Sequence, residues 1–232
     1  MVIFAILLGV LPSLIWLIFF LKEDLHPEPK GILARIFIYG SFTALMAVVF
    51  QYFFQDILNF FKIGEYAFIS FFIFAAVEEI LKFTIVYITV NKKDFFDEPV
   101  DAMIYMITAA LGFAALENIF IASNGLIFGD FKNGELFSIL TIRFVGATLF
   151  HALGSGIVGY YWAKGKWKKE NGKWSASWRM EIIKGLVIAT FLHAVFNYSI
   201  IIFKDANILI YPLIFLIIIA LVVFKDFERI KI

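Results

Sequence analysis

The stretch AAVEEILKF, residues 75–83, places two glutamates and a lysine inside an apolar run that extends from about residue 66 to residue 90. As a helix, such a run is long enough to cross the roughly 30 Å hydrocarbon core of a bilayer. An ionisable side chain at the centre of a membrane helix costs at least about 2.5–3.5 kcal/mol on insertion scales. It therefore needs a partner, a water-filled cavity or a function. The stretch predicts a membrane fold with a polar site inside it.

The composition of the whole chain agrees with an integral membrane protein. Its 232 residues are 62% hydrophobic and only 17% charged, and the mean hydropathy is +0.90. These values lie far from those of soluble domains. The chain contains no cysteine, which excludes disulfides, cysteine nucleophiles and cysteine-ligated zinc. We see no repeat, soluble domain or long linker, so we expect a single integral membrane domain over residues 1–232.

Seven apolar segments predict an all-α, polytopic transmembrane bundle. The expected spans cover about residues 2–21, 32–55, 66–90, 100–123, 136–162, 185–203 and 207–224. Cytoplasmic loops carry an excess of Lys and Arg, which makes the orientation predictable. With the N-terminus outside, the inner connections and the C-terminal end hold fifteen of the twenty basic residues, and the outer connections hold Lys62, Lys132 and Lys204. We therefore expect an outside N-terminus and a cytoplasmic C-terminus, in the cell membrane.

The connection from Lys164 to Met180 alternates basic residues with Trp167, Trp174 and Trp178. Anionic headgroups attract lysine and arginine, and tryptophan prefers the membrane interface. We interpret this connection as lipid-facing and expect membrane lipids, not nucleic acid, as its partners. By the same reasoning, Arg143 is expected to snorkel to the outer interface, and His26 to be a surface loop residue.

Further polar residues recur at helical spacing in the other predicted spans. Lys82 lies four residues after Glu78 and three after Glu79, so it can neutralise either carboxylate and leave the other free. Counting 1.5 Å per residue from the span boundaries places Glu78 and His193 both about 18 Å from the outer face. The same count gives about 22 Å for His151 and about 5 Å for Glu117. The predicted cluster is central and opens outward.

A carboxylate, two imidazoles and an amide at similar depth are suited to the hydrolysis of an amide bond. A glutamate can take a proton from water, a histidine can hold that water or protonate the leaving nitrogen, and an N–H can stabilise the oxyanion. We expect neither a cofactor nor a metal. The candidate catalytic residues are Glu78, Glu79, His151, His193 and Asn197, and the supporting residues are Lys82, Glu117 and Asn118.

Four motifs in this order resemble the PrsW family of intramembrane proteases. They are EExxK (Glu78, Glu79, Lys82), FxxxEN (Phe113, Glu117, Asn118), HxxxS/G (His151, Ser155) and HxxxN (His193, Asn197), and the HPEP loop at residues 26–29 is a further similarity. The resemblance covers about residues 22–200. It implies a glutamate-dependent, metal-independent peptidase in which Glu78 or Glu79 activates water, while His151, His193 and Asn197 bind the water or the oxyanion. It also implies a single-span membrane-protein substrate, such as an anti-sigma factor.

The chain is more distantly similar to the CAAX prenyl protease and bacteriocin-processing group. That group has an arginine one position after Lys82 and a histidine in place of Glu117, so the resemblance does not imply specificity for prenyl-cysteine.

Three other functions stay open. A zinc metalloprotease would use the glutamate and two histidines as ligands, although the chain has no HExxH motif. A transporter or proton relay would use the same buried ionisable groups as an ion pathway. A non-catalytic binding or immunity-type membrane protein would keep the polar core without the chemistry.

Overall fold

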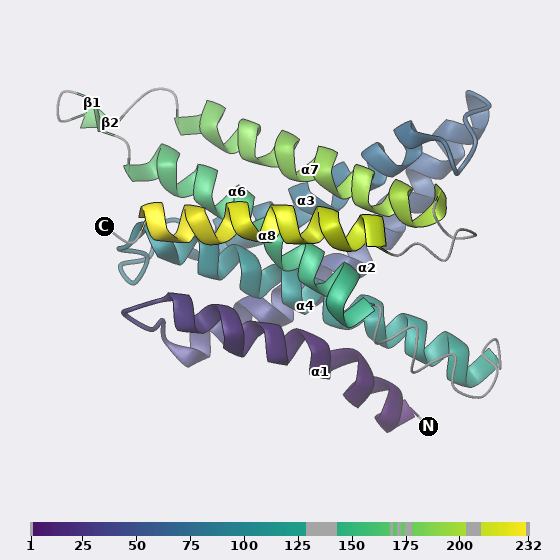
Figure 1. Ribbon diagram of the computed structural model, residues 1–232, viewed down its shortest axis with the longest axis horizontal. Coiled ribbons are helices and arrows are strands. Elements are labelled where there is room, and N and C mark those ends of the chain that lie inside the picture. Colours follow the sequence, from purple (N-terminus) through teal and green to yellow (C-terminus); the bar gives the residue numbers. More distant parts are fainter. Residues whose placement is uncertain are drawn as a thin grey trace.

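The computed structural model describes residues 2–128, 143–167, 169–170, 173–174, 178–202 and 210–230. In these residues the chain forms seven α-helices, which run side by side along the long axis of the molecule (Figure 1). They are α1 Val2–Phe20, α2 Lys30–Phe60, α3 Phe68–Val90, α4 Pro99–Phe128, α6 Leu149–Trp167, α7 Trp178–Ile202 and α8 Ile210–Ile230. Four shorter elements complete the described part: a 3-10 turn at Leu21–Glu23, a π-helical turn at Phe144–Thr148, and the paired two-residue strands β1 Lys169–Glu170 and β2 Lys173–Trp174.

The helical bundle confirms the predicted all-α class, and a count of seven membrane spans stays a prediction. Each predicted span coincides with a described helix, except that residues 136–142, 203 and 207–209 of the predicted spans lie outside the described residues. Five of the described helices, namely α1, α2, α4, α7 and α8, are long and apolar enough to cross a membrane. The other two differ by their charged and polar residues: α3 carries Glu78, Glu79 and Lys82, and α6 carries His151, Lys164 and Lys166. Which ends of the helices lie on the cytoplasmic side and which on the outer side of the membrane stays a prediction.

Helix α4 forms the centre of the bundle, because it packs against α1, α2 and α6. Every residue from Asp101 to Ala115 is buried, as expected for a helix that is apolar on all sides. Two glycines bring α2 and α4 into backbone contact: a Cβ at Gly40 would meet the carbonyl of Ala109, and one at Gly112 would meet the carbonyl of Phe37. This contact fixes α2 next to the helix that carries Glu117.

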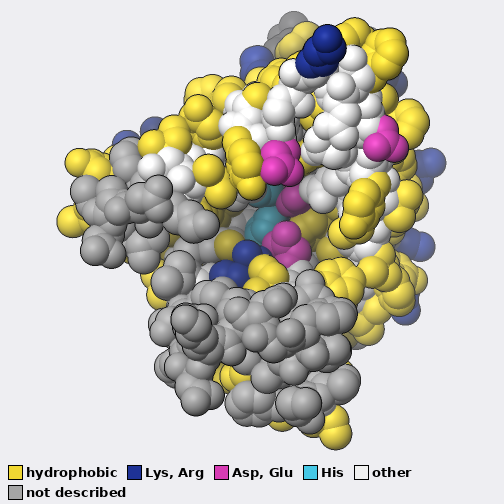
Figure 2. Space-filling view, turned by 90° about the vertical axis from the view of Figure 1, so that its right-hand side faces the viewer, with side chains coloured by type: hydrophobic (Ala, Val, Ile, Leu, Met, Phe, Trp, Pro, Cys, Tyr) yellow, Lys and Arg dark blue, Asp and Glu magenta, His cyan; other side chains and the backbone are white. Residues whose placement is uncertain are grey.

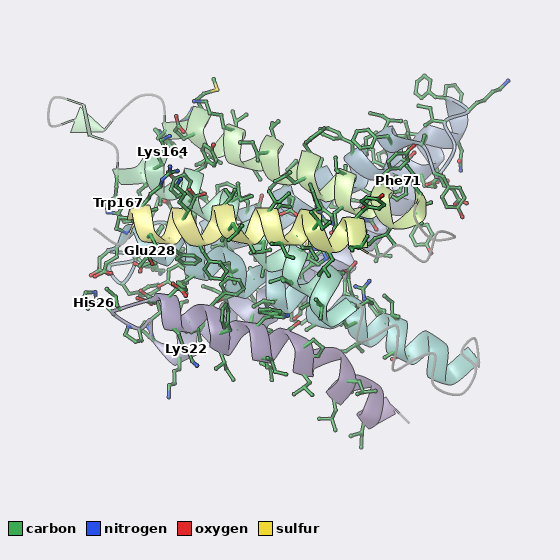
Figure 3. All side chains as sticks on the ribbon, in the orientation of Figure 1. Lys22, His26, Phe71, Lys164, Trp167 and Glu228 are labelled. Atoms are coloured by element: carbon green, nitrogen blue, oxygen red, sulfur yellow. The ribbon has the colours of Figure 1, made fainter. Side chains whose placement is uncertain are left out.

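The outside of the bundle suits a lipid environment. Large apolar side chains face outward, including Val49 and Ile88 with exposed fractions of 69% and 73%. Lys22, His26, Lys164 and Glu228 gather at one end of the molecule, whereas Phe71 lies towards the other (Figure 3). An apolar surface with charged residues at an end is the distribution expected of a membrane-spanning bundle.

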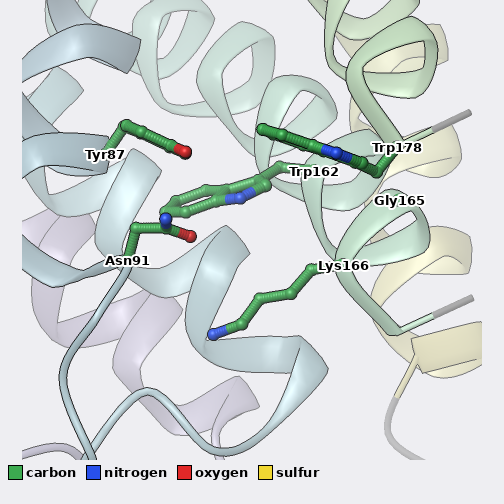
Figure 4. A pocket seen from close by; sticks show the side chains of 6 residues that line it. All are labelled: Tyr87, Asn91, Trp162, Gly165, Lys166 and Trp178. Carbon is green, nitrogen blue, oxygen red and sulfur yellow. The ribbon is translucent and has the colours of Figure 1, made fainter. Parts of the chain in front are cut away.

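A pocket of about 360 Å³ lies at the charged end, between α3, α6 and α7 (Figure 4). Its lining includes Tyr87, Asn91, Trp162, Lys166 and Trp178. The rings of Tyr87 and Trp178 stack with their centroids 6.5 Å apart. Trp178, which the sequence assigned to a lipid-facing connection, is thus the first residue of α7 and packs on α3. The lipid contacts of the connection stay a prediction. The side chain of Trp174 lies outside the described part of the structure.

Candidate active site

The predicted polar residues of α3 and α7 meet in the interior of the bundle. The carboxylate of Glu79 accepts hydrogen bonds from Lys82 Nζ at 2.7 Å and from His193 Nδ1 at 2.9 Å. Its second oxygen lies 3.4 Å from the Ser155 hydroxyl. Glu79 and Lys82 are completely buried. A buried carboxylate needs this number of donors to remain charged away from water.

These contacts fix the proton positions on both histidines. The Glu79 carboxylate only accepts, so Nδ1 of His193 carries a proton, and in the neutral imidazole Nε2 keeps a free lone pair. The Lys82 ammonium only donates, and it lies 3.1 Å from Nδ1 of His151. A neutral His151 therefore carries its proton on Nε2, which donates to Glu117 Oε2 at 2.9 Å.

Glu78 is also buried, but only one of its carboxylate oxygens has a partner. Gln51 of α2 donates to Glu78 Oε1 at 2.9 Å. Oε2 has no hydrogen-bond partner among the described residues, and it lies 3.8 Å from the lone-pair nitrogen of His193. Two hydrogen-bond acceptors thus face each other across a distance that is too long for a direct bond. Such a pair is complementary to a water molecule, which has two donors, or to a metal cation.

A second group of polar residues joins α4 to the helix that contains His151. Arg143 donates to Glu117 Oε2 at 3.2 Å and to Asn118 Oδ1 at 2.7 Å. The Asn118 amide in turn donates to Thr148 Oγ1 at 3.0 Å, at the end of the π-helical turn. Turns of this kind are frequent at functional sites, because they re-aim the residues that follow. The expectation that Arg143 snorkels to the interface is wrong: its guanidinium binds these α4 side chains instead.

Figure 2 shows histidine, acidic and basic side chains together at the bottom of a hollow in one end of the molecule. The site residues are more deeply buried towards the bottom of this hollow. The Glu117 side chain is 31% exposed, whereas those of Glu79 and Lys82 are 0% exposed. Helix α3 begins and α4 ends on this side of the site, so the site opens where Glu117 lies and closes below Glu79.

The structure brings together all the residues predicted for the site except that Asn197 lies apart from the hydrogen-bonded groups. Asn197 is half-buried on α7, one turn after His193, and its side chain makes no hydrogen bond within the described part of the chain. His26 lies in the surface loop as expected, with a 74% exposed side chain. The sequence reading missed Gln51. A lone amide in the apolar run of α2 was the available signal, because the argument applied to Glu78 applies to it also.

The donor set permits a metal at the same place. Ligand atoms of Glu78, His151 and His193 lie within 4.8 Å of one another, and two imidazoles with a carboxylate are a common zinc set. Glu78 Oε2 and His193 Nε2 are free to bind a cation. His151 is not free to bind a cation, because Lys82 Nζ lies against its Nδ1 and Glu117 Oε2 lies against its Nε2. The residues fit a metal when one of these contacts to His151 gives way.

A helical membrane protein with carboxylates and imidazoles converging inside the bundle has the composition of an intramembrane hydrolase. The chain belongs to the PrsW family: the family described as "PrsW family intramembrane metalloprotease" matches residues 28–224, which is most of its length. The protein is thus an integral membrane member of a family of proteases.

Individual relatives agree with this membership. The chain is 29% identical over 192 residues to Protease PrsW of Geobacillus kaustophilus, which covers 82% of this chain and 76% of the relative. It is 28% identical to Protease PrsW of Oceanobacillus iheyensis over 209 residues, 88% and 86% of the two chains. With Protease PrsW of Bacillus subtilis it shares 28% identity over 193 residues, 82% and 79% of the two chains. No solved structure gave a significant match.

Proposed function

We propose that the protein is a glutamate-dependent endopeptidase that hydrolyses a peptide bond of a single-span membrane protein, in the cell membrane. The observation that supports this proposal most directly is the pair of acceptors, Glu78 Oε2 and His193 Nε2, 3.8 Å apart. A water molecule between them donates one hydrogen to each, which leaves both lone pairs free and directs one of them towards a substrate carbonyl. Glu78 is the general base.

The proposed reaction has two steps. The water oxygen attacks the carbonyl carbon while its proton passes to Glu78, which gives a tetrahedral oxyanion. The C–N bond then breaks, and Glu78 returns the proton to the leaving nitrogen, so the products are a carboxylic acid and an amine. General-base catalysis of this kind contributes about 10²–10⁴-fold.

The other residues position these groups. Glu79 holds His193 by its Nδ1 proton, and Lys82 neutralises Glu79. Asn197 lies on the same face of α7, one turn from His193, and its amide N–H is the proposed donor to the oxyanion. The substrate enters from the end at which Glu117 is exposed, and the anti-sigma factors that the family resemblance implies are one candidate class.

The test is the variant Glu78→Gln, which preserves shape and removes the base. A substrate is first identified by comparing the membrane proteins of cells that carry the wild type or this variant. Cleavage of the substrate by purified protein in lipid vesicles should then fall by at least about 10²-fold, with the variant still monodisperse. Glu65→Gln, in the exposed connection before α3, serves as the control and should cleave like the wild type. Normal cleavage by Glu78→Gln would sink the glutamate mechanism.

A second candidate is a zinc-dependent peptidase, favoured by the Glu78, His151 and His193 ligand set and by the metalloprotease in the family's description. A bound zinc would polarise the substrate carbonyl and lower the pKa of a bound water. In that case Glu78, His151 and His193 would hold the ion, and either Lys82 or Glu117 would have to release His151.

Chelation separates the two candidates. The glutamate mechanism predicts that cleavage survives prolonged dialysis against a strong chelator, with less than one equivalent of zinc in the active protein by elemental analysis. Loss of cleavage that added Zn²⁺ restores, together with one tightly bound zinc, would replace the first proposal by the second.

A further inference from the structure

Five carboxylates cluster at the opposite end of α3 and α4 from the candidate active site. Asp24 and Glu28 lie in the α1–α2 connection, Asp97 and Glu98 lie in the α3–α4 connection, and Asp101 lies in the first turn of α4. Oxygens of Asp24, Glu98 and Asp101 lie within 4.8 Å of one another, and so do oxygens of Glu28, Asp97 and Asp101. Asp101 belongs to both groups, so the five residues form one cluster.

Three of these carboxylates are withdrawn from solvent. The exposed fractions of Asp24, Glu28 and Asp101 are 6%, 7% and 1%. Some of their carboxylate oxygens accept hydrogen bonds from neighbouring backbone N–H groups and from a tyrosine hydroxyl. Asp101 Oδ2 accepts from the backbone N–H of Asp97 and of Glu98, Asp24 Oδ1 accepts from that of His26, and Glu28 accepts from the Tyr105 hydroxyl.

One buried oxygen of the cluster is left without a partner. Asp24 Oδ2 makes no hydrogen bond to any described residue, although Asp24 is more than nine-tenths buried. An unpartnered buried carboxylate oxygen is unfavourable, because it has lost its hydration and gained no hydrogen bond. An oxygen of Asp24 also lies within 4.8 Å of oxygens of Glu98 and Asp101, so repulsion between the carboxylates adds to this cost. Asp24 therefore indicates that the cluster is incomplete without a positively charged ligand.

Basic side chains of the described residues supply only part of that charge, since Lys166 interacts electrostatically with Asp97 and Asp101 but forms no ion pair with them. His26 Nδ1 lies 2.6 Å from Glu98 Oε1, but His26 is exposed and contacts the outer edge of the cluster. Lys166 donates to the carbonyl of Phe96 at 3.0 Å and lies over the Phe96 ring. Among the described side chains, no Lys or Arg forms an ion pair with Asp24, Glu28, Asp97 or Asp101.

We propose that this cluster binds a hard divalent cation, with Ca²⁺ as the preferred ion. Carboxylate oxygens are the ligands that such ions prefer, and Ca²⁺ takes 6–8 of them at about 2.3–2.6 Å in flexible geometry. Two oxygens on opposite sides of a Ca²⁺ are thus about 4.6–5.2 Å apart. The oxygens of each group, all within 4.8 Å of one another, are thus close enough to ligate one such ion. Mg²⁺ requires near-octahedral ligation at about 2.0–2.1 Å. Carboxylates drawn from two connections and one helix terminus suit the more flexible geometry of Ca²⁺ better.

The bound cation joins two connections and one helix of the bundle. It fixes the α1–α2 connection against the α3–α4 connection and against the start of α4. Helices α3 and α4 carry Glu78, Glu79 and Glu117, so the site sets the relative position of these helices from the end remote from the chemistry. This role is independent of the proposed peptidase mechanism.

Terbium luminescence provides a direct test, because Tb³⁺ replaces Ca²⁺ and is sensitised by a nearby aromatic ring. Tyr105 touches Glu28 of the cluster. Purified full-length protein in detergent, freed of cations by chelation, is titrated with Tb³⁺ under excitation of tyrosine and tryptophan. We expect saturable emission that Ca²⁺ displaces at lower concentration than Mg²⁺. Ca²⁺ at 100 times its Kd should raise the unfolding midpoint by about 5 °C.

Three variants assign the signal to the cluster. Asp24→Asn keeps the acceptor for the His26 N–H and should weaken Tb³⁺ and Ca²⁺ binding at least about 10-fold, as should Glu28→Gln. Asp94→Asn removes the same charge from an exposed position in the α3–α4 connection and should bind like the wild type. Glu78→Gln should also bind like the wild type, which separates this site from the candidate active site.

The proposal is overturned by any of three results: no saturable emission with the wild type, no Ca²⁺-dependent change in its unfolding midpoint, or wild-type binding by a monodisperse Asp24→Asn protein. The first two would mean that the buried carboxylates are neutralised by protons instead.

Discussion

Two adjacent glutamates of α3 have different environments because successive residues point about 100° apart around a helix. The sequence predicts that Lys82 neutralises one of them. The structure pairs Lys82 with Glu79, three residues away, and turns Glu78 towards Gln51 and His193. Glu79 has every oxygen satisfied, whereas Glu78 has one oxygen free. The pairing assigns Glu79 a positioning role and leaves Glu78 available as the base.

This difference predicts losses of stability of very different size. Lys82→Met removes the cation and leaves Glu79 as an uncompensated buried charge, so it should lower the free energy of unfolding by about 3–5 kcal/mol. The double variant Lys82→Met, Glu79→Gln should lose clearly less, because the uncompensated charge is gone. Glu78→Gln should lose little. Unfolding midpoints in detergent measure all three, and equal losses for Lys82→Met and Glu78→Gln would contradict the assignment.

The elements that carry the site are held by close backbone contacts between α2 and α4. Ser41 donates to the carbonyl of Gly112 at 2.9 Å, next to the place where Gly40 meets Ala109. Small residues at such a crossing let two membrane helices approach closely. Gln51 and Glu117 depend on this crossing for their distance from Glu78 and His151.

Alanine at either glycine should therefore push α2 and α4 apart. We expect Gly40→Ala and Gly112→Ala each to cost about 1–3 kcal/mol of stability, as overpacking usually does. Gly31→Ala is the matched control in the same helix. A Cβ at Gly31 meets nothing within 4 Å, so that variant should be neutral or gain up to about 1 kcal/mol from better helix propensity. Thermal unfolding that ranks Gly31→Ala with the other two would disprove the crossing argument.

The helices were predictable from the sequence to a greater extent than their contacts. Apolar runs gave the positions of all the described helices, because the length of a span is fixed by bilayer thickness. Arg143 shows the limit: its distance from the end of the span suggested snorkelling, and only the tertiary fold brings Glu117 and Asn118 within its reach. Gln51 is a similar case, since nothing in α2 alone indicates that its partner is Glu78 on α3.

The two ends of the whole molecule differ in a way that bears on its orientation. One end carries the hollow above Glu117, and the other carries the charged side chains that include Lys22 and Lys164 (Figure 3). The Asp24 cluster lies at the charged end, in the connections before α2 and before α4. The positive-inside rule predicts that the charged end is cytoplasmic, and in that orientation a substrate would reach the site from outside.

Cysteine labelling tests this orientation, since the chain has no cysteine of its own. Gly64 lies before α3 and Lys93 after it, and the 23 residues of α3 span about 34 Å, enough to place them on opposite faces of the membrane. Both positions tolerate substitution, because a Cβ at Gly64 meets nothing within 4 Å and Lys93 is exposed. In intact cells, an impermeant thiol reagent should label Gly64→Cys and not Lys93→Cys, and permeabilisation should make both reactive. The reverse pattern in intact cells would put the hollow on the cytoplasmic side. Substrate cleavage would then have to occur in the inner half of the membrane, and the outward entry of the substrate would be wrong.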